Sequence, residues 1–219
     1  MITLNVTDLA KSFGTKTVFS DVSFNHSEDT LGIAGSNGSG KSTLLKCLAG
    51  LSPPTHGTVE WKEDNNFLTK EAFKSTLGYA APYINLYDEL SCRENLEFLS
   101  KVRHEPETKS QINNWIENVE LSHVADQPFG TLSTGQQQRL RLASALFHHP
   151  TILLLDEPGS NLDEAGRALI SDIAHIFRAS EKLLIIASNN PSELALCNRV
   201  FSIEQQDFVE AESGNVNRK

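Results

Sequence analysis

Residues 35–42 combine three glycines with a terminal lysine and serine. They fit the P-loop pattern, in which glycine, four variable residues and a second glycine precede lysine and then serine or threonine. Glycines let the backbone come close to phosphate oxygens, so that successive N–H groups form an anion-binding nest. Lys41 would contact the β- and γ-phosphates, and Ser42 would ligate Mg²⁺. The segment predicts a nucleoside triphosphate site.

The flanking sequence favours this phosphate site over its alternative, an ordinary tight glycine turn. Residues 30–34 are a short apolar run typical of a buried strand, and residues 42–49 carry apolar side chains at helical spacing. The partial positive charge at a helix N-terminus stabilises an anion bound in the loop that leads into the helix. The expected phosphate-binding residues are Gly35, Ser36, Asn37, Gly38, Ser39, Gly40, Lys41, Ser42 and Thr43.

Two adjacent carboxylates, Asp156 and Glu157, end the apolar run at residues 151–158. Such a run requires burial on both faces, as in a parallel sheet, and α/β proteins bind ligands at the carboxyl ends of these strands. Asp156 suits Mg²⁺, directly or through water, and Glu157 suits polarising an attacking water. A solvated strand end is the alternative interpretation of this pair.

The composition indicates an ordinary soluble globular unit, or one core with a small lobe. The chain has 219 residues, 39% of them hydrophobic, and a formal net charge of −9. This acidity argues against nucleic-acid binding, which usually needs clustered Lys and Arg. We expect neither secretion nor membrane insertion, because no apolar run approaches the roughly 18 residues of a spanning helix and no leader sequence opens the chain. Cys47, Cys92 and Cys197 are isolated, as in reduced cytoplasmic proteins.

The remaining pattern predicts the elements that position these residues. Alternating or β-forming stretches indicate an antiparallel sheet at residues 2–8, 17–25 and 57–61, followed by a polar, turn-rich stretch at 62–70. A helical insertion is expected over 91–130, with a polar break at 104–110. The other expected elements are strands at 77–81 and 182–187, helices at 133–148, 163–179 and 191–197, a hairpin at 200–209 and a loose polar tail at 210–219.

Two further residues have both a structural and a functional interpretation. Phe13 lies in the turn at residues 11–16, where it could stack on a base through its π-face or belong to the core. Ser133 is a plausible helix N-cap, which on its own is an ordinary helix start.

Taken in order, these motifs resemble those of the nucleotide-binding subunit of an ABC transporter, and the resemblance covers about residues 4–209. It rests on Phe13 at the adenine-stacking position, the P-loop, residues 132–136 (Leu-Ser-Thr-Gly-Gln) at the signature, Asp156 and Glu157 at Walker B, and residues 160–163 at the D-loop. It implies a single cassette over residues 1–219. The fold would be α/β, a P-loop NTPase core of mostly parallel sheet with flanking helices, an antiparallel β-subdomain and a small α-helical subdomain at about 83–131.

The resemblance also implies cofactors, partners and residue roles. Two cassettes, as a homodimer or heterodimer, would sandwich two ATP molecules with Mg²⁺, and Ser133, Gly135 and Gln136 of each would meet the nucleotide held by the other. The chain would hydrolyse ATP at the cytoplasmic face of the inner or plasma membrane, with Glu157 and Lys41 as catalytic residues, and drive separate transmembrane permease subunits. We expect no nucleic-acid partner.

Two departures from the family pattern leave the rate of hydrolysis open. Pro82 stands where the family usually has a glutamine that contacts Mg²⁺, and Asn189 replaces the usual γ-phosphate-binding histidine. Asn189 can still donate a hydrogen bond but cannot carry charge. One alternative is therefore an ATP-gated dimerising clamp with little hydrolysis. Another is a non-transport member of the family acting on DNA or ribosomes, although such proteins typically carry two cassettes or a long coiled coil.

Overall fold

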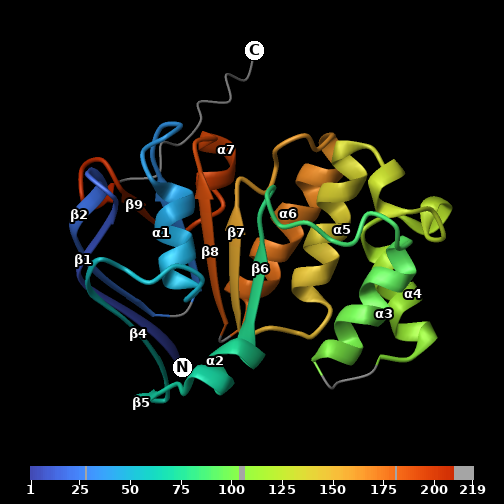
Figure 1. The fold of residues 1–219 in the computed structure, drawn as a ribbon, viewed down its shortest axis with the longest axis horizontal. Helices are drawn as coiled ribbons and strands as arrows, with labels where there is room; N and C mark the ends of the chain where they lie inside the picture. Colours follow the sequence, from blue (N-terminus) through green and yellow to red (C-terminus); the bar gives the residue numbers. More distant parts are fainter. Residues whose placement is uncertain (28, 104–106, 181, 210–219) are drawn as a thin grey trace.

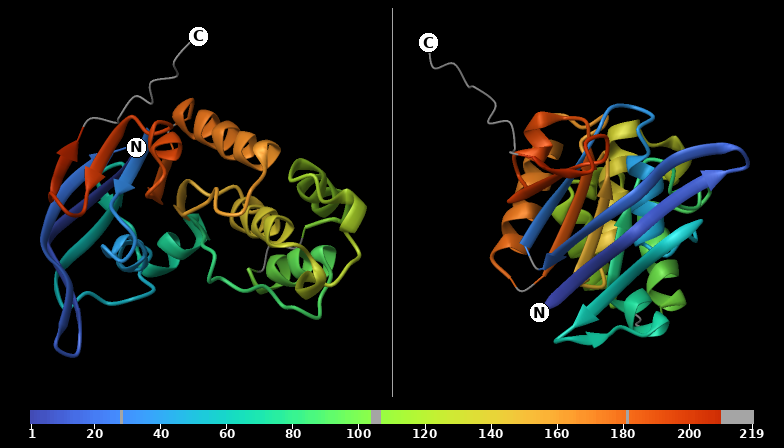
Figure 2. Two further views of the ribbon diagram at one scale, coloured as in Figure 1. Left: turned by 90° about the horizontal axis from the view of Figure 1, so that it is seen from above. Right: turned by 90° about the vertical axis from the view of Figure 1, so that its left-hand side faces the viewer.

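The computed structural model describes residues 1–27, 29–103, 107–180 and 182–209. The polar tail expected at 210–219 and part of the polar break expected at 104–110 lie outside these residues. The chain forms two sheets with helices packed around them, and the helical insertion stands at the end opposite the antiparallel sheet (Figures 1 and 2). Among the described residues, none of the helices combines the length and apolar character required to cross a membrane.

The central sheet has the strand order β10-β9-β3-β8-β7-β6 and is parallel except for the pairing of β10 with β9. Every residue of β7 and β8 is buried, because both faces of the sheet are covered. The six strands are β3 (Asp29–Ala34), β6 (Leu77–Ala80), β7 (Ile152–Asp156), β8 (Leu183–Ser188), β9 (Arg199–Ser202) and β10 (Asp207–Val209).

Alternate side chains of the central strands enter two different cores. On one face Leu154 and Ile185 pack with α1 (Lys41–Leu48) and the antiparallel sheet. On the other face Leu153 and Ile186 pack with α5 (Thr134–Leu146) and α6 (Glu164–Arg178), and α7 (Pro191–Leu194) follows β8. These layers give the expected α/β, P-loop NTPase arrangement.

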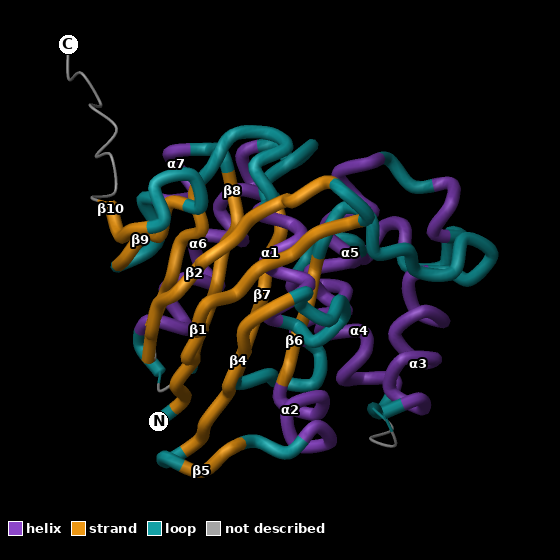
Figure 3. The backbone as a smooth tube through the Cα atoms, turned by 60° about the vertical axis from the view of Figure 1, so that its left-hand side comes forward, coloured by secondary structure: helices purple, strands orange, loops and turns teal. Residues whose placement is uncertain are grey.

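The antiparallel sheet has the order β2-β1-β4-β5, and it lies in front of α1 and the central sheet in Figure 3. Its strands are β1 (Ile2–Phe13), β2 (Lys16–Ser27), β4 (His56–Glu63) and β5 (Asn66–Phe67). β1 and β2 are longer than expected because their hairpin closes only at Gly14, whose φ of 58° requires a residue that tolerates the left-handed region.

Three further differences from the expectations concern α2 (Lys70–Thr76), the end of α5, and α7, which ends at Leu194 and not at residue 197. The stretch predicted as turns contains β5 and is followed by α2, a helix capped by Thr69 with none of its residues fully buried, so it leaves little periodic signal. Helix α5 ends at Leu146 and not at residue 148, because His149 adopts a φ of 52° and Pro150 follows.

The helical insertion has its own small core. Helices α3 (Cys92–Val102) and α4 (Lys109–Asn118) both begin with a capping box, at Ser91 and Thr108 respectively. Their apolar faces pack against 3₁₀ turns at Ser122–Val124 and Phe129–Thr131 and against α5. The insertion therefore rests on the helix that starts at the signature segment.

Candidate functional site

The P-loop joins the end of β3 to α1 in a conformation that needs its glycines. Gly38 and Gly40 have φ of 84° and 106°, and a Cβ at Gly35 would lie 2.5 Å from Ser39 Oγ. Gly40 is the N-cap of α1, so no side chain caps the first N–H groups of the helix. These groups, with the helix dipole, suit an anion such as a phosphate.

Lys41 is held over the P-loop by three oxygen atoms. Its Nζ donates hydrogen bonds to the carbonyl oxygens of Gly35 (2.9 Å) and Ser36 (3.1 Å), and it lies 3.1 Å from Glu157 Oε1. Glu157 directly follows β7 and has a φ of 45°, a backbone conformation that residues other than glycine rarely adopt. The strained turn points this carboxylate at the lysine.

Asp156, the last residue of β7, is a buried carboxylate without a hydrogen-bond partner. Its side chain is 0% exposed, and neither oxygen meets hydrogen-bond geometry with a described residue. Burial raises the pKa of Asp156, and the nearby Ser42 and Tyr83 hydroxyls oppose this effect. A buried oxygen ligand that lacks a partner, beside a serine hydroxyl, fits the oxygen ligands that Mg²⁺ prefers. Ser42 and Asp156 are thus suited to hold the ion.

A cavity of about 400 Å³ lies over the P-loop and brings together most of the predicted phosphate-binding residues with Glu157. It is lined by Lys16, Thr17, Val18, Asn37, Gly38, Gly40, Lys41, Ser42, Thr43 and Glu157. Phe13 is not among these residues. It lies at the end of β1, 57% exposed, with Lys11 Nζ 4.8 Å from its ring centroid, on the same hairpin that supplies Lys16.

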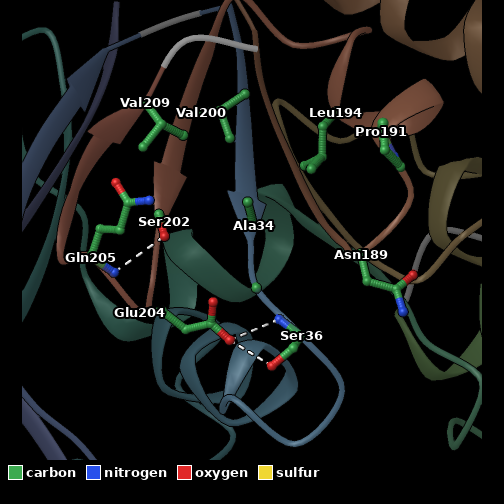
Figure 4. Close-up of a pocket in the computed structure, with 11 residues that line it drawn as sticks. Ala34, Ser36, Asn189, Pro191, Leu194, Val200, Ser202, Glu204, Gln205 and Val209 are labelled. Carbon is green, nitrogen blue, oxygen red and sulfur yellow. Dashed lines mark hydrogen bonds between the residues drawn. The ribbon is translucent and has the colours of Figure 1, made fainter. Parts of the chain in front are cut away.

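Ser36 and Asn37 are hydrogen-bonded to residues that follow two strands far away in the sequence. Glu204 Oε1 accepts hydrogen bonds from Ser36 N (3.1 Å) and Ser36 Oγ (2.5 Å), beside a cavity of about 350 Å³ between the P-loop, α7 and the β9–β10 hairpin (Figure 4). These bonds lower the pKa of Glu204. Asn189, which follows β8, donates from Nδ2 to Asn37 Oδ1 at 2.8 Å. Asn189 thus contacts the P-loop, and its hydrogen bond to the γ-phosphate stays a prediction, whereas sequence reasoning missed Glu204.

The signature residues form a second, separate site. Ser133 caps α5, its Oγ accepts from Gln136 N (3.3 Å) and its N–H donates to Gln136 Oε1 (2.9 Å). A Cβ at Gly135 would lie 2.9 Å from the Asn161 carbonyl oxygen, so the signature packs tightly on the 160–163 loop. This site opens to a cavity of about 530 Å³ that shares no lining residue with the P-loop cavity.

Pro82 follows β6 and leads to a tyrosine that sequence reasoning did not single out. The Tyr83 hydroxyl hydrogen-bonds the Tyr79 hydroxyl and approaches Asp156. Burial raises the pKa of Tyr79 to about 12 and raises that of Tyr83 as well, so both phenols stay protonated at neutral pH. The sequence held one signal, three tyrosines all within residues 79–87.

Comparison with known proteins places these features in a family. The family model described as "ABC transporter" matches residues 19–160. The chain is 33% identical to the uncharacterized ABC transporter ATP-binding protein YybJ of Bacillus subtilis, over 89% of each chain. It is 31% identical to the cytochrome c biogenesis ATP-binding export protein CcmA of Pseudomonas aeruginosa, over 88% of this chain and 95% of that protein.

A longer relative and two solved structures are also similar to this chain. The Nod factor export ATP-binding protein I of Sinorhizobium fredii is 32% identical over 93% of this chain, which spans 60% of that protein's length. The structure of the ATP-binding cassette MJ0796 bound to ADP and Pi has a TM-score of 0.79 at 24% identity, covering 91% of this chain and 93% of its own. A putative ABC transporter ATP-binding protein from Pyrococcus furiosus has a TM-score of 0.78 at 24% identity, covering 94% and 99%. These two structures support the fold.

Proposed function

The chain belongs to the ABC transporter family as an ATP-hydrolysing subunit with ATP and Mg²⁺ as cofactors, and we propose that two such cassettes close head to tail over two ATP molecules. The observation that carries this proposal is the division of the site. The P-loop and Glu157 line one cavity, and the signature serine lines another that shares no residue with it. The P-loop cavity lacks the signature serine, and the signature cavity lacks the P-loop. A second cassette would therefore complete both nucleotide sites.

Within one cassette, each residue has a role that its surroundings suit. Lys41 and the uncapped N–H groups of α1 would bind the phosphates, and Ser42 and Asp156 would hold Mg²⁺. When bound by these residues, the ion would neutralise part of the phosphate charge. Glu157 would accept the proton of the attacking water, and Asn189 would donate a hydrogen bond to the γ-phosphate.

Across the dimer, the start of α5 would face the partner's nucleotide. Ser133 is exposed at the helix N-terminus, where N–H groups and the helix dipole favour negative charge. Gly135 lets this turn lie against the 160–163 loop, and Gln136 fixes the serine through the capping box. ATP would thus hold the dimer closed, and hydrolysis would let it open.

The proposed transport function would require membrane-spanning partner subunits. We place the cassette at the cytoplasmic face of the membrane, docked to separate permease subunits through the helical insertion. On α3, Phe98 and Val102 are 38% and 57% exposed and are four residues apart, so they lie on one face of the helix. The relatives' names include exporters and a phosphate-import protein, so neither cargo nor direction is part of the proposal.

Light scattering with the Glu157→Gln variant tests the closed dimer. Because this variant would keep the ATP it binds, we expect Mg²⁺-ATP to convert the 24.1 kDa chain into a species of twice that mass. Mg²⁺-ADP should leave it monomeric. A monomer at saturating Mg²⁺-ATP would refute the proposal.

A second candidate function is an ATP-gated clamp that closes but turns over slowly. Pro82 and Asn189 favour it, since one cannot contact Mg²⁺ and the other cannot carry charge. Steady-state ATPase activity of the purified chain, alone and with its membrane partner, separates the two functions. Turnover that rises with the partner favours the transport ATPase, whereas closure with negligible turnover in both cases favours the clamp.

A further inference from the structure

Two phenols stand between the central sheet and the start of the helical insertion. Tyr79 lies on β6, which pairs in parallel with β7 and places Tyr79 opposite Leu154 and Ala80 opposite Leu155. Tyr83 follows β6 in the segment that leads to α3, and its hydroxyl is hydrogen-bonded to that of Tyr79. The strand thus fixes one phenol, and that phenol orients the other.

The pairing of Ala80 with Leu155 places the segment that follows β6 beside the end of β7, where Asp156 lies. The Tyr83 hydroxyl opposes the rise that burial causes in the pKa of Asp156, although neither Asp156 oxygen meets hydrogen-bond geometry with a described residue. Lys46 of α1 lies over the Tyr83 ring, with Nζ 3.9 Å from the centroid, and holds the ring against the P-loop helix. A tyrosine ring held on α1 therefore lies in the segment beside a buried carboxylate whose oxygens have no hydrogen-bond partner among the described residues.

The segment that carries Tyr83 is also attached to the signature helix. Arg141 of α5, itself 8% exposed, donates from Nε to the Ile84 carbonyl oxygen at 2.7 Å. Further along, Asn95 of α3 is 1% exposed and bonds the backbone N–H and C=O of Tyr87. A displacement of Tyr83 would therefore strain the hydrogen bonds that join this segment to α5 and α3.

We infer that Tyr83, oriented by Tyr79, is the positioning residue that links the helical insertion to the Asp156 side of the Mg²⁺-ATP site. It serves where Pro82 replaces the glutamine of the family pattern, because its phenol can donate a hydrogen bond to the charged Asp156 carboxylate and proline has no such donor. This inference rests on the proposed function of Asp156 as a metal ligand.

The test uses the fact that the chain has only three tyrosines, Tyr79, Tyr83 and Tyr87. In protein labelled with ¹³C at tyrosine Cζ, single Tyr→Phe variants assign each resonance. We expect the Tyr83 resonance to shift when Mg²⁺ and ATP are added together, but not with ATP and EDTA. Tyr87, which is 53% exposed, serves as an internal reference. A Tyr83 resonance that stays unmoved while nucleotide binding is evident would overturn the inference.

The Tyr83→Phe variant supplies a second readout. It keeps the ring and its contact with Lys46 but removes the hydroxyl. We expect the Mg²⁺ concentration for half-maximal ATPase activity to rise about tenfold, with KM for ATP at saturating Mg²⁺ unchanged and melting temperature preserved. Tyr87→Phe is the matched control. An unchanged Mg²⁺ dependence would refute the role of Tyr83, whereas absence of any Mg²⁺-ATP binding by the wild-type chain would instead refute the proposed function.

Discussion

The Lys41 ammonium lies 3.1 Å from the Glu157 carboxylate and joins the P-loop to the end of β7. Lys41 is 5% exposed and Glu157 is 27% exposed, so the pair is partly shielded from water. In the proposed function the lysine binds a phosphate of the nucleotide, and the glutamate accepts a proton from the attacking water. A phosphate that binds Lys41 would therefore free Glu157 to accept a proton.

Replacing Glu157 with glutamine should separate binding from hydrolysis. The amide keeps the shape of the side chain but cannot accept the proton of water, so we expect turnover to fall by roughly 10²- to 10⁴-fold. ATP affinity should change little, because Lys41 keeps its two carbonyl contacts. Turnover and binding of a fluorescent ATP analogue measure the two effects. Glu71→Gln, at an exposed position on α2, is the control, and near-normal turnover in Glu157→Gln would assign the base elsewhere.

Asn189→Ala tests whether a neutral amide can serve at the γ-phosphate. Asn189 is exposed beside the P-loop, and its amide could exchange its hydrogen bond to Asn37 for one to a ligand. Loss of a hydrogen bond to a charged group should lower kcat about tenfold or more, with KM for ATP nearly unchanged. Asn189→His should retain activity. If the alanine variant hydrolyses ATP at the wild-type rate, Asn189 has no part in the reaction.

His148 should make stability depend on pH in the acidic range. Its Nε2–H donates to the Leu77 carbonyl oxygen at 3.0 Å, and its buried Nδ1 has no hydrogen-bond partner. Burial, helped by Arg103, lowers the pKa of His148 from 6.5 to about 4. Because the folded state resists protonation more than the unfolded state, stability is complete above pH 6.5 and is lost as the pH falls toward 4, by at most about 3 kcal/mol.

Urea unfolding of wild type and His148→Gln between pH 7.5 and 4 measures this contribution. The glutamine can still donate to Leu77 but does not titrate, so the variant should lose less stability than wild type on acidification. His56→Gln, at an exposed site, should follow the wild-type curve. Parallel curves for His148→Gln and wild type would contradict the assignment.

Gly135→Ala should damage the signature without removing a polar group. The added Cβ would lie 2.9 Å from the Asn161 carbonyl oxygen, which is backbone and cannot rotate away. We expect the monomer to lose about 1 to 2 kcal/mol of stability and the ATP-dependent dimer to be weakened more strongly. Thermal unfolding and light scattering give the two values. A variant that dimerises like wild type would show that the close packing of signature and 160–163 loop is dispensable.

The central fold could be predicted because its signals are local. The runs that became β3, β7 and β8 are continuously apolar, and the polar motifs begin where those runs end. Helix α2 could not be predicted in the same way, since its seven residues include none that are buried. The site shows the same limit. The contact of Glu204 with Ser36 spans 168 positions and leaves no local pattern in the sequence. The three tyrosines cluster within residues 79–87, but the orientation of Tyr83 depends on the pairing of β6 with β7, which the cluster does not indicate.

The role of Phe13 remains a prediction for a related reason. Its ring is exposed at the end of β1 and contacts Lys11, and the hairpin supplies Lys16 to Val18 to the P-loop cavity. Stacking on a base depends on the ligand itself, which no local pattern encodes. Phe13→Ala should therefore weaken ATP binding more than triphosphate binding, and equal losses for both would indicate that the ring does not contact adenine.

The head-to-tail arrangement is tested most directly by cross-linking two different chains, one with Asn37→Cys and one with Ser133→Cys. The three natural cysteines are buried, so the new thiols should react selectively. We predict a disulfide-linked dimer only when both variants are mixed and Mg²⁺-ATP is present. Cross-links within either variant alone, or the same yield without nucleotide, would contradict the account.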